Sequence, residues 1–274
     1  MRAALVTEYR KLVTTRLWWV LLASMAAYMV FLGGVFAFSF TVTGAGRTGS
    51  TTGMTDVNGA LLPPREIAIA VYTLATSLGY VFPVIVGALS FTGEVRHHTL
   101  TPTFLAEPRR GVVLTAKMLS SLPMGLVFGL VGTISTAGAG AAVLALRGHD
   151  TFLTDAAMLR TIGLSVVALT VWCSVGVGFG AVVTNQVASV VVLLAFTQFV
   201  EPLLRVLLGQ FDAVAAAAKF LPGAAGEAIT GGSFYSTSGL AELLNPWQGF
   251  GVLVAYAVVF AVVARLVTLE RDIT

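Results

Sequence analysis

Six long apolar stretches constrain the fold of this 274-residue sequence more than any other feature. A helix needs about 20 largely apolar residues to cross about 30 Å of hydrocarbon at about 1.5 Å per residue. Each of the six stretches is long enough. They cover residues 17–40, 67–91, 118–146, 162–183, 187–208 and 250–269. The pattern predicts an all-α membrane protein in which six transmembrane helices form one domain over residues 1–274.

Composition supports that prediction, because 57% of the residues are hydrophobic and only 11% are charged, against about a quarter charged in soluble domains. The first apolar stretch is much longer than the core of a signal peptide, so we expect no cleavable signal. Lys and Arg are more frequent in the segments on the side of the N-terminus, which predicts that both termini are cytoplasmic. No basic cluster with interleaved aromatic residues occurs, and we therefore expect no nucleic-acid partner.

The first 16 residues, MRAALVTEYRKLVTTR, are too polar to cross a membrane. On a helix they place an apolar face opposite a polar one, which is typical of an amphipathic helix lying along the inner leaflet. The apolar face contains Leu5, Val6, Tyr9, Leu12 and Val13, and the polar face contains Thr7, Arg10, Lys11, Thr14 and Thr15. We expect the functional residues of this interfacial helix to be Glu8, Tyr9, Arg10, Lys11 and Arg16.

Two segments on the predicted outer side are long. Residues 41–66 are rich in Gly, Thr and Ser, and this composition predicts a flexible loop. Residues 210–248 contain two apolar pieces of about ten residues, separated by Pro222 and Gly223. Pieces of that length are too short to cross a bilayer, so we expect re-entrant or interfacial half-helices before the sixth span.

The sequence lacks the residue patterns of a hydrolase or a metal site, since neither H-E-x-x-H nor G-x-S-x-G occurs. His97 and His98 have no third ligand at a suitable spacing, and the lone Cys173 is interpreted as a core residue. We therefore expect no catalytic residue, no metal ion and no cofactor in this chain. The first four spans carry no charge between their ends, and the sixth carries only Arg265 near its end. Glu201 and Arg205 of the fifth are the exception, and their i,i+4 spacing favours a structural ion pair over a proton relay.

Pairs of glycines four residues apart indicate where helices approach closely. The pairs are Gly125 with Gly129 and Gly176 with Gly180. The second pair lies in GVGFG, which superficially resembles a phosphate-binding loop. It is in the middle of a predicted span with no lysine after it, so helix packing is the better interpretation.

The segment GEVRHHTLTPTFLAEPRRG, residues 93–111, is unusually polar for a connection between two spans. Pro102 suits the first position of a helix and Pro108 disfavours helix at Glu107, so a short helix is expected at residues 102–106. Phe104 and Leu105 would then be apolar residues within a charged rim. Such a surface is suited to docking another protein. An ordinary cytoplasmic loop with positive-inside charges is the alternative.

This segment, preceded by a basic N-terminal helix and two spans, resembles the permease subunits of type-2 ATP-binding-cassette (ABC) exporters. The family pattern of Gly-Glu, a basic residue, Thr-Leu, Pro, Arg and Lys is matched by Gly93, Glu94, Arg96, Thr99, Leu100, Pro108, Arg110 and Lys117. His98 departs from it, because the family commonly has Gly before Thr-Leu. The six spans, the cytoplasmic termini and the broken segment before the last span also agree with the family.

The resemblance implies a transmembrane exporter subunit that carries out no catalysis. Its partners would be a second copy or a homologous permease and separate cytoplasmic ATPase subunits, which would bind ATP and Mg²⁺. The substrate would be amphipathic or hydrophobic, such as a drug, an antibiotic, a peptide or a lipid-like molecule. The location would be the cytoplasmic membrane of a bacterium, and most of the 16 basic residues are Arg, as in proteins of GC-rich bacterial genomes.

The residues expected to couple the permease to its ATPase lie in or beside segment 93–111. They are Glu94, Arg96, Thr99, Leu100, Phe104, Leu105, Glu107, Pro108, Arg109, Arg110 and Lys117. Candidate residues for the substrate pathway are the aromatic side chains Phe31, Phe36, Tyr72, Tyr80 and Phe82. Pro83 is expected to kink the second span. Two other functions stay open from the residues alone: a passive pore or secondary carrier, and a membrane sensor or immunity subunit.

Overall fold

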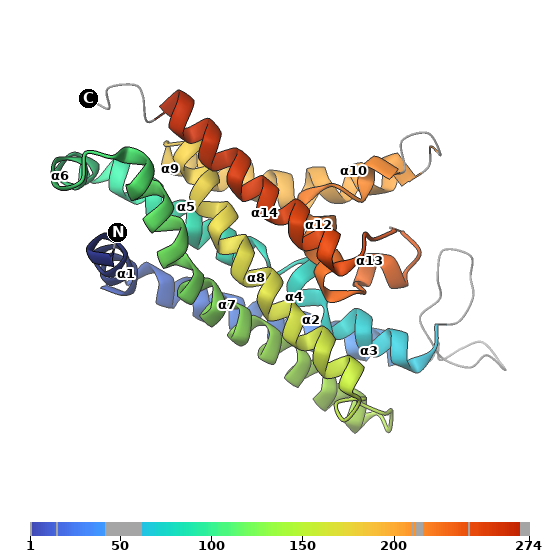
Figure 1. Ribbon diagram of the computed structural model, residues 1–274. Helices are drawn as coiled ribbons and strands as arrows, with labels where there is room; N and C mark the ends of the chain where they lie inside the picture. The colour runs from blue at the N-terminus through green and yellow to red at the C-terminus, as the bar shows by residue number, and fades with distance from the viewer. Residues whose placement is uncertain are drawn as a thin grey trace.

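The computed structural model describes residues 2–14, 16–41, 62–209, 211, 216–240 and 242–268, and every regular element within these ranges is a helix. Five helical runs in them are long and apolar enough to cross a membrane. They are α2 (Leu17–Thr41), α7 (Arg110–Leu146), α8 (Ala156–Val182), the run Gln186–Leu208 and the run Pro246–Thr268. The long helices lie side by side in one bundle (Figure 1). The chain is therefore an all-helical, multi-pass membrane protein by the length and composition of its helices.

The remaining helical elements are shorter. The fourth run consists of α9 (Gln186–Ala195), the π-helical turn η1 (Phe196–Val200) and α10 (Glu201–Gly209), and the fifth of α14 (Pro246–Val263) and η2 (Ala264–Thr268). The others are α1 (Arg2–Thr14), α3 (Pro64–Tyr72), α4 (Leu74–Ser77), α5 (Val81–Arg96), α6 (Leu100–Ala106), α12 (Pro222–Thr230) and α13 (Phe234–Thr237).

The stretch predicted as one span at residues 67–91 is divided among α3, α4 and α5. The helix is interrupted at Thr73 and again at residues 78–80. The predicted kink of a continuous helix at Pro83 is wrong, because Pro83 lies in the first turn of α5. A proline is tolerated there, since the N–H groups of the first turn have no partner within the helix. The break in the helix therefore lies at residues 78–80, before Pro83, and a new helix begins at Val81.

Helix α8 lies at the centre of the bundle and packs against α5, α7 and α14, while α2 packs against α7. A methyl group at Gly176 or Gly180 would overlap backbone atoms of α5, and one at Gly125 or Gly129 would overlap backbone carbonyl oxygens of α8. The predicted close helix approach at both glycine pairs is thus confirmed. Cys173 is fully buried at the same contacts, in agreement with its interpretation as a core residue.

The segment before the last span contains a buried half-helix. α12 begins at Pro222, as the sequence indicated, and ends at Gly231, whose φ of 77° is left-handed. It has nine residues, too few to cross a bilayer, and it packs between α8 and α14. Residues 210, 212–215 and 241 of this segment lie outside the described ranges, as do residues 42–61 of the predicted loop.

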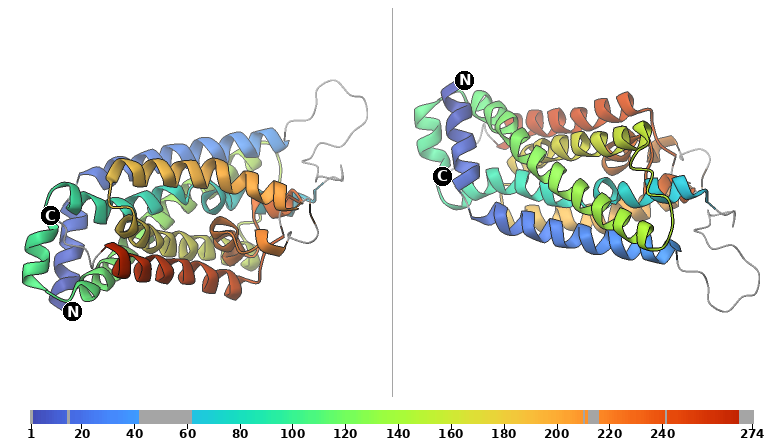
Figure 2. Two further views of the ribbon diagram at one scale, coloured as in Figure 1. Left: turned by 90° about the horizontal axis from the view of Figure 1, so that it is seen from above. Right: turned by 90° about the horizontal axis from the view of Figure 1, so that it is seen from below.

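α1 and α6 lie together at one end of the bundle (Figure 2). The last turn, η2, reaches the same end, because the guanidinium of Arg265 lies beside Gly111 at the start of α7. The polar segment 93–111, the N-terminal helix and the end of the last span are therefore neighbours in space.

Candidate functional site

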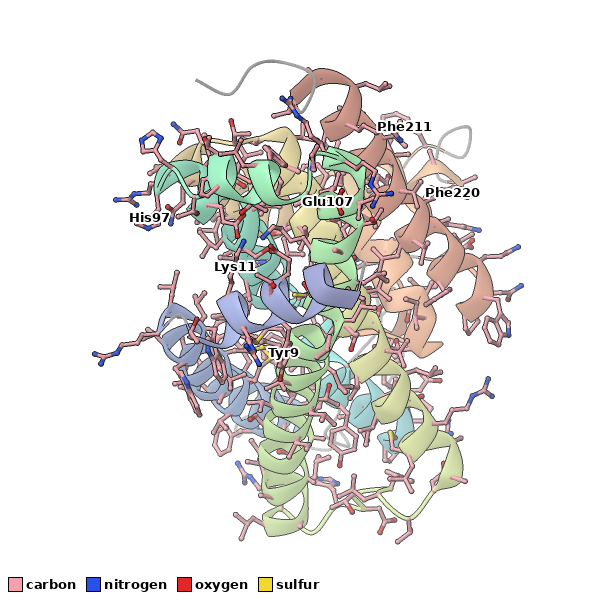
Figure 3. The ribbon with its side chains drawn as sticks, turned by 60° about the vertical axis from the view of Figure 1, so that its left-hand side comes forward. Tyr9, Lys11, His97, Glu107, Phe211 and Phe220 are labelled. Carbon is pink, nitrogen blue, oxygen red and sulfur yellow. The ribbon has the colours of Figure 1, made fainter. Side chains whose placement is uncertain are left out.

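A network of four charged side chains, of which Lys11 is partly exposed, joins α1 to α5 and α7. Lys11 Nζ lies 2.8 Å from Glu8 Oε1 and 2.9 Å from Glu94 Oε1. Lys117 Nζ lies 3.1 Å from Glu94 Oε1 and also pairs closely with Glu8 Oε2. The side chains of Lys117 and Glu8 are only 2% and 4% exposed. We call Glu8, Lys11, Glu94 and Lys117 the basal network, and it joins α1 to the bundle. Figure 3 shows α1, with Lys11, lying across the bundle.

The two cations and two anions of the basal network cancel, which makes their burial tolerable. Burial alone would raise the pKa of Glu8, but Lys117 and Lys11 outweigh it, so that the pKa of Glu8 is lower than its ordinary value. Burial would likewise lower the pKa of Lys11, but Glu8 and Glu94 outweigh it and raise that pKa. Both shifts favour the charged forms that the network needs.

The basal network gives α1 an orientation that its apolar pattern did not predict. Glu8 faces the bundle, whereas Tyr9 is 45% exposed and Arg10 and Arg16 are also exposed. A helix is present over Arg2–Thr14, and its location along the membrane surface stays a prediction. Its contact with the bundle includes a buried ion pair between Glu8 and Lys117. This pair could not be predicted, because the two residues are far apart in sequence and leave no local pattern.

Helix α6 presents the predicted combination of apolar residues and a charged rim. Leu105 is 80% exposed, whereas Leu100 at the start of the helix is buried and anchors it. Glu107 and Arg109 form a surface pair at 2.9 Å, and this pairing with Arg109 lowers the pKa of Glu107. Pro108, between them, is exposed. The tip of α6 is therefore an exposed leucine beside a fixed charge pair.

Two contacts tie α6 to the rest of the bundle. The Arg110 guanidinium lies over the ring of Phe104 at 5.4 Å, which links α6 to the first turn of α7. Lys11 Nζ donates to the Thr103 hydroxyl group at 3.1 Å, which links α6 to the basal network. α6 is thus connected directly to α1 and α7, and indirectly to α5 through the ion pair of Lys11 with Glu94.

His97 and His98 form the end of α5 and explain its turn toward α6. The N–H of Thr99 donates to the Glu94 carbonyl oxygen at 3.0 Å and that of His98 donates to the Val95 carbonyl oxygen at 3.2 Å. This is the Schellman pattern, and it places His98 at the left-handed position with a φ of 55°. Glycine is favoured at that position. His98 therefore occupies a turn position at which glycine would avoid the strain of a positive φ.

The two remaining predicted coupling residues lie beside this turn. Arg96 Nη1 donates to Gln186 Oε1 at 3.2 Å, so it connects the end of α5 with the start of α9. The hydroxyl group of Thr99 donates to the Glu94 carbonyl oxygen at 3.4 Å. Of the eleven predicted coupling residues, Glu94, Leu100 and Lys117 are buried, and the exposed ones surround α6.

A cavity of about 530 Å³ opens beside the basal network. Its wall is mostly apolar, with Leu17, Trp18, Leu21, Val86 and Leu89, and its polar end contains Lys11, Ser90, Glu94, His97 and Lys117. Ligand sites typically have about this size and this combination of an apolar wall and a few polar groups. The cavity could therefore hold an amphipathic molecule.

The five aromatic residues predicted to line a substrate pathway do not border this cavity. Phe31 is 62% exposed on α2, and Phe36 packs edge-on against Phe234. Tyr72 and Tyr80 are buried, and their hydroxyl groups donate to the carbonyl oxygens of Thr151 and Thr197. Phe82 packs against Tyr28 with ring centroids 5.8 Å apart. The structure thus disperses these side chains over packing contacts rather than gathering them.

The predicted pair of Glu201 and Arg205 is confirmed, with Arg205 Nη2 2.7 Å from Glu201 Oε1. A third member was missed: Glu227 of α12 lies 2.7 Å from Arg205 Nη1. All three side chains are at most 3% exposed. From sequence, Glu227 could not be assigned to this cluster, because the half-helix that carries it had no predicted position in the bundle.

Fold and sites together define a multi-pass helical membrane protein with two ion clusters in different parts of the bundle. Among the described residues, no group of three His, Cys, Asp or Glu side chains is placed to hold a metal ion. No protein-family model matches the sequence, and no curated protein matches it either.

Proposed function

We propose that this protein is the permease subunit of an ATP-driven type-2 ABC exporter, in which six membrane-crossing segments form the pathway and a separate chain hydrolyses ATP. In this proposal α3, α4 and α5 together make the second crossing. The two ion clusters of the bundle then lie toward its two membrane surfaces, and both termini are cytoplasmic. The membrane is the cytoplasmic membrane of a bacterium.

One observation carries the proposal: α6 offers an exposed leucine, Leu105, on a short helix that is fastened to the basal network. An ATPase needs a contact that is accessible to it and stiff enough to transmit its movement. Leu105 and the pair of Glu107 and Arg109 provide the accessible part. The contacts of Thr103 with Lys11 and of Phe104 with Arg110 provide the stiff part.

In the proposed mechanism, closure of the ATPase pair pushes α6, and the push reaches the spans through these contacts. Lys11 passes it to α1 and to Glu94 of α5, and Arg110 passes it to α7. Because α5 and α7 both pack on α8, a movement of their ends changes the packing at the centre of the bundle. This chain supplies no catalytic group to the hydrolysis of ATP.

The cavity beside the basal network supports an amphipathic substrate. Its apolar wall suits a hydrocarbon body and its polar end suits a headgroup. It lies beside α1, where in this proposal a molecule would arrive from the inner leaflet. Trp18 belongs to both the wall and the start of α2, a position at which tryptophan commonly meets the membrane surface.

The test is transport by the purified protein together with the ATPase that copurifies with it. Reconstituted vesicles should accumulate an amphipathic probe only when ATP is present. Leu21→Trp places a larger side chain in the cavity and should reduce probe-stimulated ATP hydrolysis while basal hydrolysis remains. Val20→Trp is the matched control, because Val20 is 61% exposed on the same helix. Transport that proceeds without ATP or without an ATPase chain would contradict the proposal.

A secondary carrier is the second candidate, and the cluster of Glu201, Arg205 and Glu227 favours it. Buried ionisable groups within a membrane are typical of ion-coupled carriers. The same vesicles distinguish the two functions. Uptake driven by a proton gradient in the absence of ATP, and abolished by Glu227→Gln, would support the carrier.

A further inference from the structure

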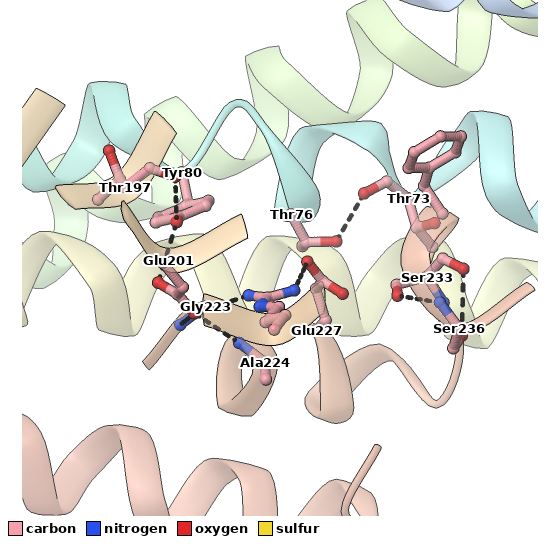
Figure 4. A network of polar contacts seen from close by, with 12 residues as sticks. Thr73, Thr76, Tyr80, Thr197, Glu201, Gly223, Ala224, Glu227, Ser233 and Ser236 are labelled. Atoms are coloured by element: carbon pink, nitrogen blue, oxygen red, sulfur yellow. Dashed lines mark hydrogen bonds and ion pairs between the residues drawn. The ribbon is translucent and has the colours of Figure 1, made fainter. Parts of the chain in front are cut away.

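α10 and α12 carry the cluster of Glu201, Arg205 and Glu227, and they lie in the half of the bundle away from α1 and α6 (Figure 2). Figure 4 shows Glu201 and Glu227 of this cluster from close by. Arg205 lies between the two carboxyl groups, at 2.7 Å from an oxygen of each. Both glutamate side chains are 0% exposed. If both were ionised, the three groups would sum to one negative charge in a site that is closed to solvent.

The neighbouring titratable side chains do not supply the missing positive charge. They are Tyr80 before α5, Tyr235 of α13 and Tyr256 of α14, and each is neutral when protonated. The ring of Tyr235 lies 5.1 Å from the Arg205 guanidinium, which places an aromatic face rather than a cation on that side. Among the described residues around the cluster, Arg205 is thus the cation that both glutamates share.

Glu201 receives most of the hydrogen bonds in the cluster. Its Oε1 accepts from the N–H groups of Gly223 and Ala224, at 2.6 Å and 3.1 Å, and from Arg205 Nη2 at 2.7 Å. Gly223 and Ala224 belong to the first turn of α12, where the positive end of the helix dipole also favours an anion. All three of these contacts are donors, which are the partners that a carboxylate accepts from.

The local backbone aims Glu201 at this position. The N–H of Glu201 donates to the Phe196 carbonyl oxygen, five residues back, in the π-helical turn η1. Pro202 has no N–H, so the Thr197 carbonyl oxygen is left for the hydroxyl group of Tyr80, which lies 3.2 Å from it and 3.3 Å from Glu201 Oε2. The π-helical turn and the hydroxyl group of Tyr80 therefore position the carboxylate of Glu201.

Glu227 has a poorer environment for a charge. Its Oε1 accepts one hydrogen bond from Arg205 Nη1, while its Oε2 is buried and accepts none. A buried oxygen without a partner is unfavourable for a carboxylate, but a protonated carboxyl group can place its hydrogen there. The hydroxyl group of Ser233 is close enough to Glu227 to interact with it, and a hydroxyl group can either donate a hydrogen bond or accept one.

We propose that Glu227 carries a proton at neutral pH, which makes the cluster a binding site for one exchangeable proton. An ordinary glutamic acid, with a pKa of about 4.3, is protonated in only about one molecule in 500 at pH 7. Burial of an uncompensated charge opposes ionisation by far more than this factor. With one proton bound, Glu201 and Arg205 balance and every charge in the cluster is paired. This proposal does not rest on the proposed export function.

Infrared spectroscopy of the full-length protein in lipid nanodiscs tests the proposal. At pH 7 the wild type should show the carbonyl stretch of a protonated carboxyl group in an apolar environment. This band should shift in D₂O and decrease only at alkaline pH. Glu227→Gln should abolish it, whereas the exposed Glu242→Gln should leave it unchanged. A wild-type spectrum without the band at pH 7 would overturn the proposal.

Thermal unfolding decides which glutamate holds the proton. Glutamine closely resembles a protonated glutamic acid, so Glu227→Gln should keep the unfolding midpoint of the wild type. Glu201→Gln removes the anion that balances Arg205 and should lower the midpoint. If Glu227→Gln is as damaging as Glu201→Gln, or fails to fold while Glu201→Gln is tolerated, Glu227 is not the protonated group.

Discussion

Lys117 of α7 and Glu8 of α1, 109 residues apart in sequence, form an ion pair that is almost completely removed from solvent. The sequence predicts that the N-terminal helix lies along the membrane surface. The ion pair attaches this helix to the bundle. It also places two of the residues predicted for ATPase coupling, Glu94 and Lys117, behind the contact surface and not on it. Their role in coupling would therefore be to hold α6 and α1 in register.

Removing one member of this pair should loosen α1. Lys117→Met leaves Glu8 buried without its closest cation, and breaking a buried pair costs about 3–5 kcal/mol. The double variant Glu8→Leu, Lys117→Met keeps Lys11 paired with Glu94 at 2.9 Å and should recover much of that loss. Thermal unfolding measures both, with the exposed Arg10→Ala as the control. Equal losses in the single and double variants would show that the pair is not coupled.

The attachment of α1 should depend on pH in a defined window. The pKa of Glu8 is below its ordinary 4.5, so its contribution is complete above pH 4.5 and is lost as the pH falls through the lower value. The pKa of Lys11 is above its ordinary 10.5, so its contribution is complete below pH 10.5 and is lost as the pH rises through the higher value. Protease resistance of α1 should follow this profile. Glu8→Gln should remove the acid-side change, and an unaltered acid limb would contradict the assignment.

His98→Gly should stabilise the protein. A residue with a side chain at a φ of 55° costs about 1 kcal/mol relative to glycine, and the Schellman hydrogen bonds remain. His97→Gly is the matched control, because His97 has a φ of −94° and gains nothing from glycine. Unfolding midpoints of the two variants should move in opposite directions. A decrease for His98→Gly would mean that its imidazole makes a contact that outweighs the strain.

The contact between α5 and α8 should not tolerate a methyl group. Gly87→Ala would bring its new methyl group into the Cys173 carbonyl oxygen, a backbone atom that cannot move aside. Gly93→Ala, on the same helix, meets nothing within 4 Å and should be neutral or favourable by about 0.5–1 kcal/mol. The yield of monodisperse protein and its unfolding midpoint compare the two. Similar yields and unfolding midpoints for the two variants would show that α5 and α8 are not closely packed at Gly87.

Features with a local cause could be predicted from the sequence. The proline at position 222 starts α12, and the glycine pairs mark helix contacts. The helix predicted at residues 102–106 ends before Pro108 as expected, but it begins at Leu100, two residues before Pro102. Each of these effects acts within a few residues of its cause. The apolar lengths likewise identified the five helical runs long enough to cross a membrane.

Features with a distant cause could not be predicted. The run of residues 67–91 is divided into three helices, and the middle one, α4, packs against α12, which is far from it in sequence. Glu227 joins Arg205 only because α12 folds back between α8 and α14. Single-sequence patterns record neither contact.

The most direct test of the proposed function is ATP hydrolysis by the complex of this protein with its ATPase. Leu105→Ala, Phe104→Ala and Arg110→Glu should each lower hydrolysis stimulated by an amphipathic probe about tenfold, with membrane insertion unchanged. Leu146→Ala is the control, since Leu146 is 86% exposed at the opposite end of α7. Full stimulation in all three α6-surface variants would contradict the account.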